Sequence, residues 1–150
     1  MRFQTNEASC GLAAMSNALG CLGIKRTEDE LAPAARFTAA NGTNPRGMIR
    51  ALSSIPDLVP EVIHESRADV AVLKLQSRLR AGFPVILLVD NDDHWVVAFG
   101  VLGETVHVCD SAHADLVITY DLPDIMSRWK SEGRKPYYGI ALGFNAQYLN

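Results

Sequence analysis

The residue best suited to chemistry is Cys10, which stands at the start of a predicted helix with Gln4 six residues upstream. The thiolate is the nucleophilic form of cysteine. A helix N-terminus, with unpaired N–H groups and about half a positive charge, favours that form. Gly11 follows and lets the backbone approach a substrate closely. A single cysteine on a helix is more often a small buried hydrophobic residue, so a catalytic interpretation of Cys10 needs partners elsewhere in the chain.

A histidine and an aspartate in the second half of the chain have the spacing that such a thiolate needs. His94 follows the acidic turn 91–93 and opens an apolar run, and Asp110 ends the next predicted strand 16 residues later. In an antiparallel pair joined by a turn at 103–104, the end of the second strand lies beside the start of the first. We therefore expect Asp110 to accept from His94, orient the ring and stabilise its charged form. Taken singly, a strand histidine is more often structural, and Asp110 would be a turn residue.

Three further positions complete the candidate site. The Gln4 amide and the Cys10 backbone N–H can donate together to an oxyanion on a carbonyl attacked by the thiolate, although a surface polar residue is the simpler interpretation of Gln4. Trp95, next to the histidine, is a candidate wall of the substrate cleft. Asp92 and Asp93 precede that histidine, and we expect them to raise its pKa and to bind a cationic substrate.

The elements that must position these residues follow from hydrophobic periodicity and turn signals. Helices are predicted first, and an antiparallel meander follows. The predicted helices are 8–22, 28–37, 45–53, 68–81 and 124–130, and the predicted strands are 58–64, 84–90, 95–102, 106–110, 116–120 and 137–144. This order predicts an α+β fold in two layers, with a helical N-terminal half packed on an antiparallel β-sheet.

Length and composition fit one globular domain, residues 1–150. The chain is 48% hydrophobic and carries a formal net charge of −3, so it can bury a core. It offers no polybasic surface for nucleic acid or a membrane. The longest apolar run, 84–89, is too short to span a bilayer. No secretory signal precedes Cys10, which indicates a cytoplasmic protein if residue 1 is the native start. Oligomeric state stays open.

The other two cysteines, Cys21 and Cys109, are interpreted as structural residues of the interior. Three cysteines are an odd number and argue against a disulfide framework. The cysteines and His94 lack the C-x2-C or H-x3-H spacing of zinc sites. A zinc site therefore has little support, and neither a metal nor another cofactor is expected.

Taken together, Gln4-x5-Cys10-Gly-Leu-Ala-Ala, His94-Trp-Val-Val and Asp110 resemble the C39 peptidase family. Its members are papain-like cysteine peptidases, best known as bacteriocin-processing domains that cut after a double glycine in leader peptides. The resemblance spans essentially the whole chain and implies a papain-like fold and a peptide or protein substrate. It also implies Cys10 as nucleophile, His94 as general base and acid, Asp110 as the residue that orients His94, and Gln4 as oxyanion donor.

The chain departs from the family pattern beside the candidate site. Ser9 precedes the nucleophile where the family often has aspartate, and Ser111 follows Asp110 where the family often has proline. Neither change removes a catalytic atom. The transporter-fused members continue into a membrane region and an ATPase, whereas this chain has neither and resembles a stand-alone domain.

The leading hypothesis is a soluble thiol hydrolase, a cysteine peptidase that cleaves a peptide or isopeptide amide. The same residues would serve an acyltransferase or a deamidase, which remain the nearest alternatives. A non-catalytic peptide-binding module ranks lower, because degenerate members normally lose the cysteine or the histidine and this chain keeps both.

Overall fold

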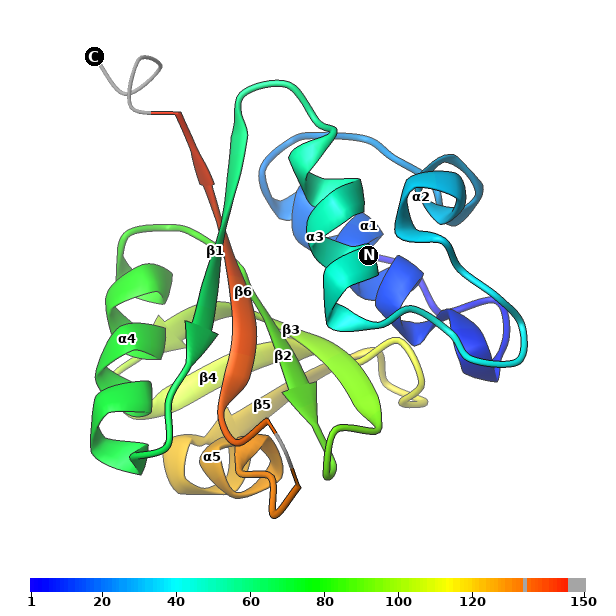
Figure 1. The fold of residues 1–150 in the computed structure, drawn as a ribbon. Coiled ribbons are helices and arrows are strands. Elements are labelled where there is room, and N and C mark those ends of the chain that lie inside the picture. The colour runs from blue at the N-terminus through cyan, green and yellow to red at the C-terminus, as the bar shows by residue number, and fades with distance from the viewer. Residues whose placement is uncertain (134, 146–150) are drawn as a thin grey trace.

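The computed structural model describes residues 1–133 and 135–145 (Figure 1). Its helices are the 3-10 turn η1 (Glu7–Ser9), α1 (Cys10–Cys21), α2 (Glu28–Ala35), α3 (Pro45–Ser53), α4 (Ala68–Arg80) and α5 (Leu122–Trp129). Its strands are β1 (Leu58–His64), β2 (Val85–Val89), β3 (His94–Leu102), β4 (Thr105–Cys109), β5 (Val117–Asp121) and β6 (Tyr138–Phe144). Every predicted helix and strand is present, with small differences at the ends.

Local capping explains where two of the N-terminal helices begin. The Thr27 hydroxyl accepts from the Glu30 N–H at 3.1 Å, and the Glu30 carboxylate accepts from the Thr27 N–H at 3.2 Å, which forms a capping box at the start of α2. The Asn44 side chain accepts from the Gly47 N–H at 2.8 Å, and Pro45 occupies the first turn of α3. Both predicted helix starts are confirmed.

The strands form one antiparallel sheet in the order β1-β6-β2-β3-β4-β5. Strands β2 to β5 are consecutive neighbours, which confirms the predicted meander. Strand β6 enters between β1 and β2 and so places β2 and β3 in the middle of the sheet. The start of β3, where His94 stands, therefore belongs to a central strand.

Helices cover both faces of the sheet, so the prediction of two layers was wrong. Figure 1 shows α1, α2 and α3 on one side of the sheet and α4 and α5 on the other. Alternate residues of β2 divide between two cores: Ile86 and Leu88 face the first three helices, and Val85, Leu87 and Val89 face α4 and α5. Because β2 is buried on both faces, its sequence is an unbroken apolar run.

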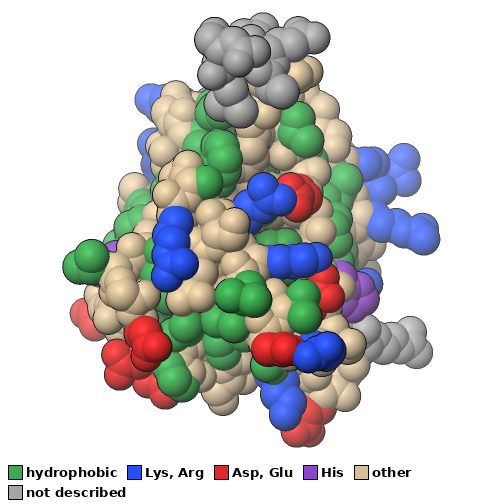
Figure 2. Space-filling view, turned by 90° about the vertical axis from the view of Figure 1, so that its left-hand side faces the viewer, with side chains coloured by type: hydrophobic (Ala, Val, Ile, Leu, Met, Phe, Trp, Pro, Cys, Tyr) green, Lys and Arg blue, Asp and Glu red, His purple; other side chains and the backbone are tan. Residues whose placement is uncertain are grey.

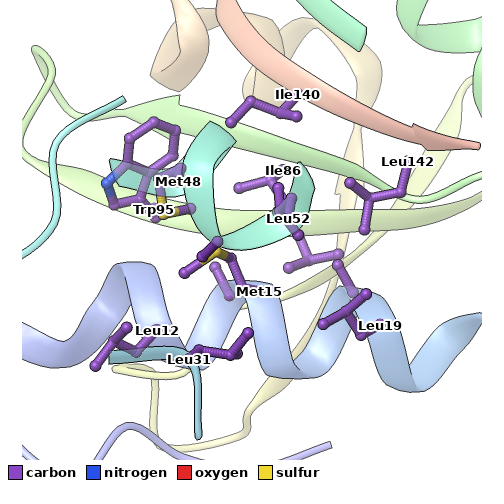
Figure 3. Close-up of a cluster of buried hydrophobic side chains, with 14 of the residues drawn as sticks. Leu12, Met15, Leu19, Leu31, Met48, Leu52, Ile86, Trp95, Ile140 and Leu142 are labelled. Atoms are coloured by element: carbon purple, nitrogen blue, oxygen red, sulfur yellow. The ribbon is translucent and has the colours of Figure 1, made fainter. Parts of the chain in front are cut away.

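The core on the α1 side holds the helix that carries the candidate nucleophile (Figure 3). Leu12, Met15 and Leu19 are buried along one stripe of α1. They belong to a cluster that includes Trp95 of β3 and Met48 of α3. This packing fixes α1 against the central strand on which His94 lies.

The two remaining cysteines differ in their surroundings. Cys109, at the end of β4, is buried as predicted. Cys21 is exposed, so the prediction of an interior position was wrong. It lies nine residues after Leu12, about two and a half helical turns, and therefore on the face of α1 opposite the buried stripe.

Figure 2 presents the α4 side of the molecule, where basic and acidic side chains are interspersed with hydrophobic ones. Arg67, the N-cap residue of α4, forms an ion pair with Asp69, and both side chains are largely exposed. Within the described residues, no helix is long and apolar enough to cross a membrane.

Candidate active site

Cys10 is the first residue of α1 and is half-buried. The turn before it is held by side chains: Asn6 Oδ1 accepts from the Ala8 N–H at 3.0 Å, and the buried Ser9 hydroxyl accepts from the N–H groups of Thr5 and Asn6, both at 3.1 Å. Ser9 thus organises the loop at the position where the family pattern often has aspartate. The thiol stands at the N-terminus of α1, where backbone N–H groups have no partner within the helix.

Gly11 brings the start of α1 close to β3. A Cβ atom added to this residue would lie 3.1 Å from Met48 Sδ, 3.2 Å from Thr43 Cβ and 3.3 Å from Trp95 Cδ1. A side chain here would push the helix of the nucleophile away from the strand. The structure therefore gives Gly11 a packing role, and its predicted contact with substrate stays a prediction for its backbone.

His94, the first residue of β3, and Asp110, which follows β4, are joined by a hydrogen bond of 2.7 Å between Nε2 and Oδ1. Val97 pairs with Cys109 in the sheet, so Asp110 stands opposite Val96 and diagonal to His94, within reach of its ring. The two side chains are 15% and 7% exposed. The predicted pairing of this histidine with this aspartate is confirmed.

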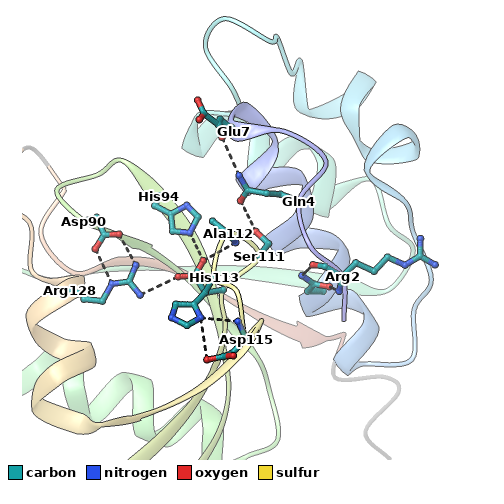
Figure 4. A network of polar contacts seen from close by, with 12 residues as sticks. Arg2, Gln4, Glu7, Asp90, His94, Ser111, Ala112, His113, Asp115 and Arg128 are labelled. Carbon is teal, nitrogen blue, oxygen red and sulfur yellow. Dashed lines mark hydrogen bonds and ion pairs between the residues drawn. The ribbon is translucent and has the colours of Figure 1, made fainter.

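Further donors fix the Asp110 carboxylate (Figure 4). Its Oδ1 also accepts from the Ala112 N–H at 3.1 Å, and its Oδ2 lies 3.4 Å from Arg128 Nη1. Burial acts against ionisation, but the hydrogen bond with His94, the charge of that ring and these two donors outweigh it and hold the pKa of Asp110 at about 2. Asp110 is therefore ionised at neutral pH.

The ring of His94 interacts with the thiol as well as with the carboxylate. Burial favours the neutral ring, but hydrogen bonds with Asp110 and with Cys10, and the negative charges of both, outweigh it and raise the pKa of His94 to about 9. Because Nε2 of the ring is hydrogen-bonded to Asp110, Nδ1 is the ring nitrogen that is available to the Cys10 thiol. His94 is an imidazolium at neutral pH, the form that stabilises a neighbouring thiolate.

The expectation that Asp92 and Asp93 raise the pKa of His94 was wrong. The groups that raise it are Asp110 and Cys10. Asp93 is exposed, and water and salt screen a charge in that position. Both turn aspartates instead line a hollow beside Cys10.

This hollow, which we call the cysteine hollow, has a volume of about 480 Å³. Its lining comprises Glu7, Ala8, Cys10, residues 39–43, Asp92, Asp93 and Trp95. Trp95 is 4% exposed and belongs to this lining, and its role as a wall of the substrate cleft stays a prediction. Thr43 Oγ1 and Asp92 Oδ1, both in residues of this lining, are buried atoms for which the described residues provide no hydrogen-bond partner. Such unpaired atoms cost free energy that a bound polar group could recover.

A second hollow of about 460 Å³, the histidine hollow, is lined by both His94 and Asp110. Its lining comprises Gln4, Glu7, Asp90, Asp93, His94, Asp110, Ala112, His113 and Arg128. Glu7 and Asp93 belong to both linings, so the two hollows adjoin. A chain laid across this boundary would pass both the thiol and the imidazolium.

Gln4 lies in the histidine hollow, but its amide already has partners. Its Nε2 donates to the carbonyls of Asn6 at 2.9 Å and Glu7 at 3.4 Å, and its Oε1 accepts from the Ser111 hydroxyl at 2.8 Å. The Gln4 N–H also donates to the Ser111 carbonyl at 3.1 Å. The structure therefore brings Gln4 to the site, while its donation to an oxyanion stays a prediction that requires the amide to change partners.

Sequence reasoning missed Arg128 and gave Ser111 no role. Arg128 reaches Asp110 across 18 residues of sequence, from a short helix on which a single arginine carries no signal. Ser111 stood out only as a departure from the family pattern, and its partner Gln4 is 107 residues away. Neither contact could be inferred without the order of the strands.

The arrangement can perform nucleophilic attack and proton transfer. A thiol at a helix N-terminus, a charged imidazole and a buried carboxylate are the groups that these two steps need. Over residues 1–133 and 135–145, no group of three or more histidine, cysteine and acidic side chains could hold a metal ion.

Solved structures of similar fold are peptidase domains. The peptidase domain of Streptococcus ComA, a bi-functional ABC transporter involved in a quorum sensing pathway, gives a TM-score of 0.74 at 15% identity over 96% of this chain and 97% of that chain. A double glycine motif protease from an AMS/PCAT transporter, in complex with the leader peptide, gives 0.72 at 17% identity over 95% and 89%. A protein from Bacillus anthracis described as a C39-like peptidase gives 0.72 at 13% identity over 97% and 94%. The expected papain-like fold is confirmed.

Sequence comparison gives the family. No curated protein matches the chain significantly. The family model described as "Peptidase_C39 like family" matches residues 1–137, which is most of the chain. The chain therefore belongs to the Peptidase_C39 like family.

Proposed function

We propose that this chain is a cysteine peptidase that hydrolyses a peptide amide bond with Cys10, His94 and Asp110. The observation that carries the proposal is the 2.7 Å bond of His94 Nε2 with Asp110 Oδ1, made by a ring that also interacts with Cys10. The three groups are held by three different elements, α1, β3 and the end of β4. A C39 peptidase-like fold supports the same conclusion.

In the acylation step the Cys10 thiolate attacks the carbonyl carbon, so a C–S bond forms and the C=O electron pair moves to oxygen. His94 gives its Nδ1 proton to the leaving nitrogen as the C–N bond breaks. The now neutral ring then takes a proton from water, whose oxygen attacks the thioester. The C–S bond breaks, the thiolate returns, and the proton restores the imidazolium. Asp110 keeps the ring oriented throughout.

Two donors are available for the negative oxygen of the intermediate. The backbone N–H of Cys10 belongs to the first turn of α1, where N–H groups have no partner within the helix. The Gln4 amide is the second donor, once its Nε2 leaves the carbonyls of Asn6 and Glu7. Loss of one such donor typically slows catalysis by about 10²–10³-fold.

The substrate we propose is a peptide with a basic side chain near the scissile bond. The cysteine hollow has three carboxylates, those of Glu7, Asp92 and Asp93, and no lysine or arginine is among the described residues of its lining. These carboxylates would attract a cation placed there. Salt would screen this attraction only weakly if the bound peptide excludes water. One solved structure of similar fold contains a leader peptide, which supports a peptide in this position.

The test is cleavage of a diverse peptide mixture, read by mass spectrometry of the products. Cleavage should disappear in Cys10→Ala and in His94→Ala and should persist in Cys21→Ser, which removes a thiol outside the site. Cleavage that persists in Cys10→Ala would refute the proposal. A double variant, Asp92→Asn with Asp93→Asn, should slow the turnover of basic peptides more than that of neutral ones. Equal effects on both would remove the proposed preference.

The same mixture separates the alternative activities. Products joined to an added small amine would indicate an acyltransferase, and ammonia released from glutamine side chains would indicate a deamidase. A non-catalytic peptide-binding module would bind peptides without converting them, and its Cys10 would react with iodoacetamide no faster than Cys21.

We further propose that residues 1–150 work as one domain in a reducing compartment such as the cytoplasm. The sheet runs through both halves of the chain, since β1 pairs with β6. Cys10, Cys21 and Cys109 are all unpaired thiols, and the nucleophile must stay reduced to act.

A further inference from the structure

Arg128 joins three parts of the molecule around the candidate triad, and Figure 4 shows its contact with Asp90. Its Nε and Nη2 donate to the two carboxylate oxygens of Asp90 at 2.9 and 2.6 Å. Its Nη1 donates to the Tyr120 hydroxyl at 2.9 Å and lies 3.4 Å from Oδ2 of Asp110. One planar cation therefore connects the end of β2, strand β5 and the end of β4.

The position of Arg128 is fixed by α5. Its neighbours Ile125 and Trp129 are fully buried, and Trp129 Nε1 donates to the Tyr138 carbonyl at 2.7 Å. The hydrogen bonds with Asp90 outweigh burial and raise the pKa of Arg128 above its usual range. The guanidinium is therefore a charged group in a fixed place, with its side chain 23% exposed.

The contact with Asp90 also secures a strained turn that leads into His94. Asp90, Asn91 and Asp92 have φ values of 56°, 58° and 66°. This left-handed region costs free energy for residues other than glycine, although aspartate and asparagine tolerate it best. The Arg128 carbonyl accepts from the Asp90 N–H at 3.0 Å, so Arg128 holds the turn through its backbone as well as its side chain.

We propose that Arg128 is a positioning residue that holds Asp110 and the turn before His94 at the same time, and so keeps the carboxylate and the imidazole in hydrogen-bonding register. The inference rests on the proposed function, because it assigns a role within that triad. Arg128 lies near Oδ2 of Asp110, whereas the ring uses Oδ1, so its effect on the ring passes through the carboxylate.

Other titratable groups share the histidine hollow with the ring. They are Glu7, Asp90, Asp93, Asp110, His113 and Arg128. Of these, Asp110 acts on the pKa of His94, together with Cys10 from the neighbouring helix. A change in the His94 titration caused by substitution of Arg128 therefore reports on Asp110.

Two possible roles of Arg128 predict different changes in the pKa of His94 when Arg128 is substituted. If it acted only as a nearby cation, Arg128→Gln would ease formation of the imidazolium and raise the pKa of His94, and Arg128→Lys would leave it unchanged. If it acts by position, both substitutions lower this pKa, because a loosened Asp110 gives up the bond that raises it. Lysine keeps the charge but lacks the fork that reaches several oxygens at once.

The experiment follows the His94 ring by NMR titration and the alkylation of Cys10 by iodoacetamide. A Cys21→Ser background removes the exposed competing thiol. We expect Arg128→Lys and Arg128→Gln each to lower the pKa of His94 by about one, a tenfold change in its protonation constant. Alkylation at about pH 8 should slow as well, because about half of the variant rings have lost the proton there, whereas most parent rings keep it and stabilise the thiolate.

Arg67→Gln is the matched control. Arg67 makes the same two-bond contact with Asp69, at 3.1 and 2.6 Å, beside α4 and outside both hollows. Its loss should leave the His94 titration and the alkylation rate at their parent values. A shift as large as that of the Arg128 variants would overturn the proposal, since any lost arginine pair would then suffice.

Asp90→Asn provides a second test in case the Arg128 variants do not fold. This substitution weakens the contact between Arg128 and the turn 90–92, and it leaves Arg128 itself unchanged. Asp90 is not among the groups that set the pKa of His94. A fall in that pKa would therefore come from geometry. An unchanged or raised pKa in the folded variants overturns the positioning role. Neither readout uses a substrate, so a pKa that falls as expected without any peptide cleavage would refute the proposed function alone.

Discussion

Replacement of Asp110 by asparagine tests the central contact of the site. The pKa of His94 rises from 6.5 to about 9 in the folded chain, which corresponds to about 3 kcal/mol in favour of the imidazolium. Burial lowers the pKa of His94, so the interactions of Asp110 and Cys10 with the imidazolium must together exceed this net free energy. Asparagine keeps the size of the side chain and removes its charge. We expect Asp110→Asn to lower the pKa of His94 by about two.

The assay is NMR titration of the His94 ring in the Cys21→Ser background. Asp93→Asn is the control, because Asp93 is a neighbouring carboxylate that does not set the pKa of His94. We expect its titration to match the parent. The reasoning is refuted if His94 titrates at the parent pH in Asp110→Asn, or if Asp93→Asn lowers the midpoint by the same amount.

Four other outcomes follow from the structure. Because the pKa of His94 is raised, its contribution to the free energy of unfolding is complete below pH 6.5 and is lost as pH rises through about 9. In urea unfolding, the free energy by which the parent is more stable than Asp110→Asn should therefore decrease between these two pH values. Gly47→Ala should destabilise the fold by about 1–2 kcal/mol, because its Cβ would lie 2.2 Å from the Ala35 carbonyl. Gly20→Ala, which meets no atom within 4 Å, should stabilise it by about 0.5–1 kcal/mol in thermal unfolding. Ser111→Ala should slow turnover about tenfold by releasing the Gln4 amide, with the His94 titration unchanged.

The pairing of His94 with Asp110 could be predicted because it depends on neighbouring elements. His94 and Asp110 lie on consecutive strands of a meander, and a short turn leaves few ways to pair them. The start of α1 could be predicted for the same reason, because nearby polar side chains fix Cys10 and the turn before it. Contacts of this kind depend on short-range geometry, which periodicity and turn signals describe well.

The contacts that were missed depend on the order of the strands and on the phase of a helix. Arg128 meets Asp90 only because α5 packs beside the end of β2, a neighbour 38 residues earlier in the chain. The position of Cys21 could not be inferred from its apolar neighbours alone, because the helix turns it to the face opposite Leu12. The second helical layer was missed for a similar reason: the sequence of α4 shows an apolar stripe but not the face of the sheet that it covers.

Part of the backbone strain and both unpaired buried side-chain atoms of the described residues lie near the candidate site. Three of the seven non-glycine residues in left-handed conformation among the described residues are 90–92, two positions before His94. Thr43 Oγ1 and Asp92 Oδ1, in the lining of the cysteine hollow, are buried and find no partner among the described residues. A fold selected for stability alone would have no reason to place these costs beside a thiol and an imidazolium. A peptide backbone in the cysteine hollow offers both N–H and C=O groups, which can pair with a carboxylate oxygen and with a hydroxyl. These two buried atoms would then gain partners from a bound peptide, which is the physical reason for proposing that the substrate lies there.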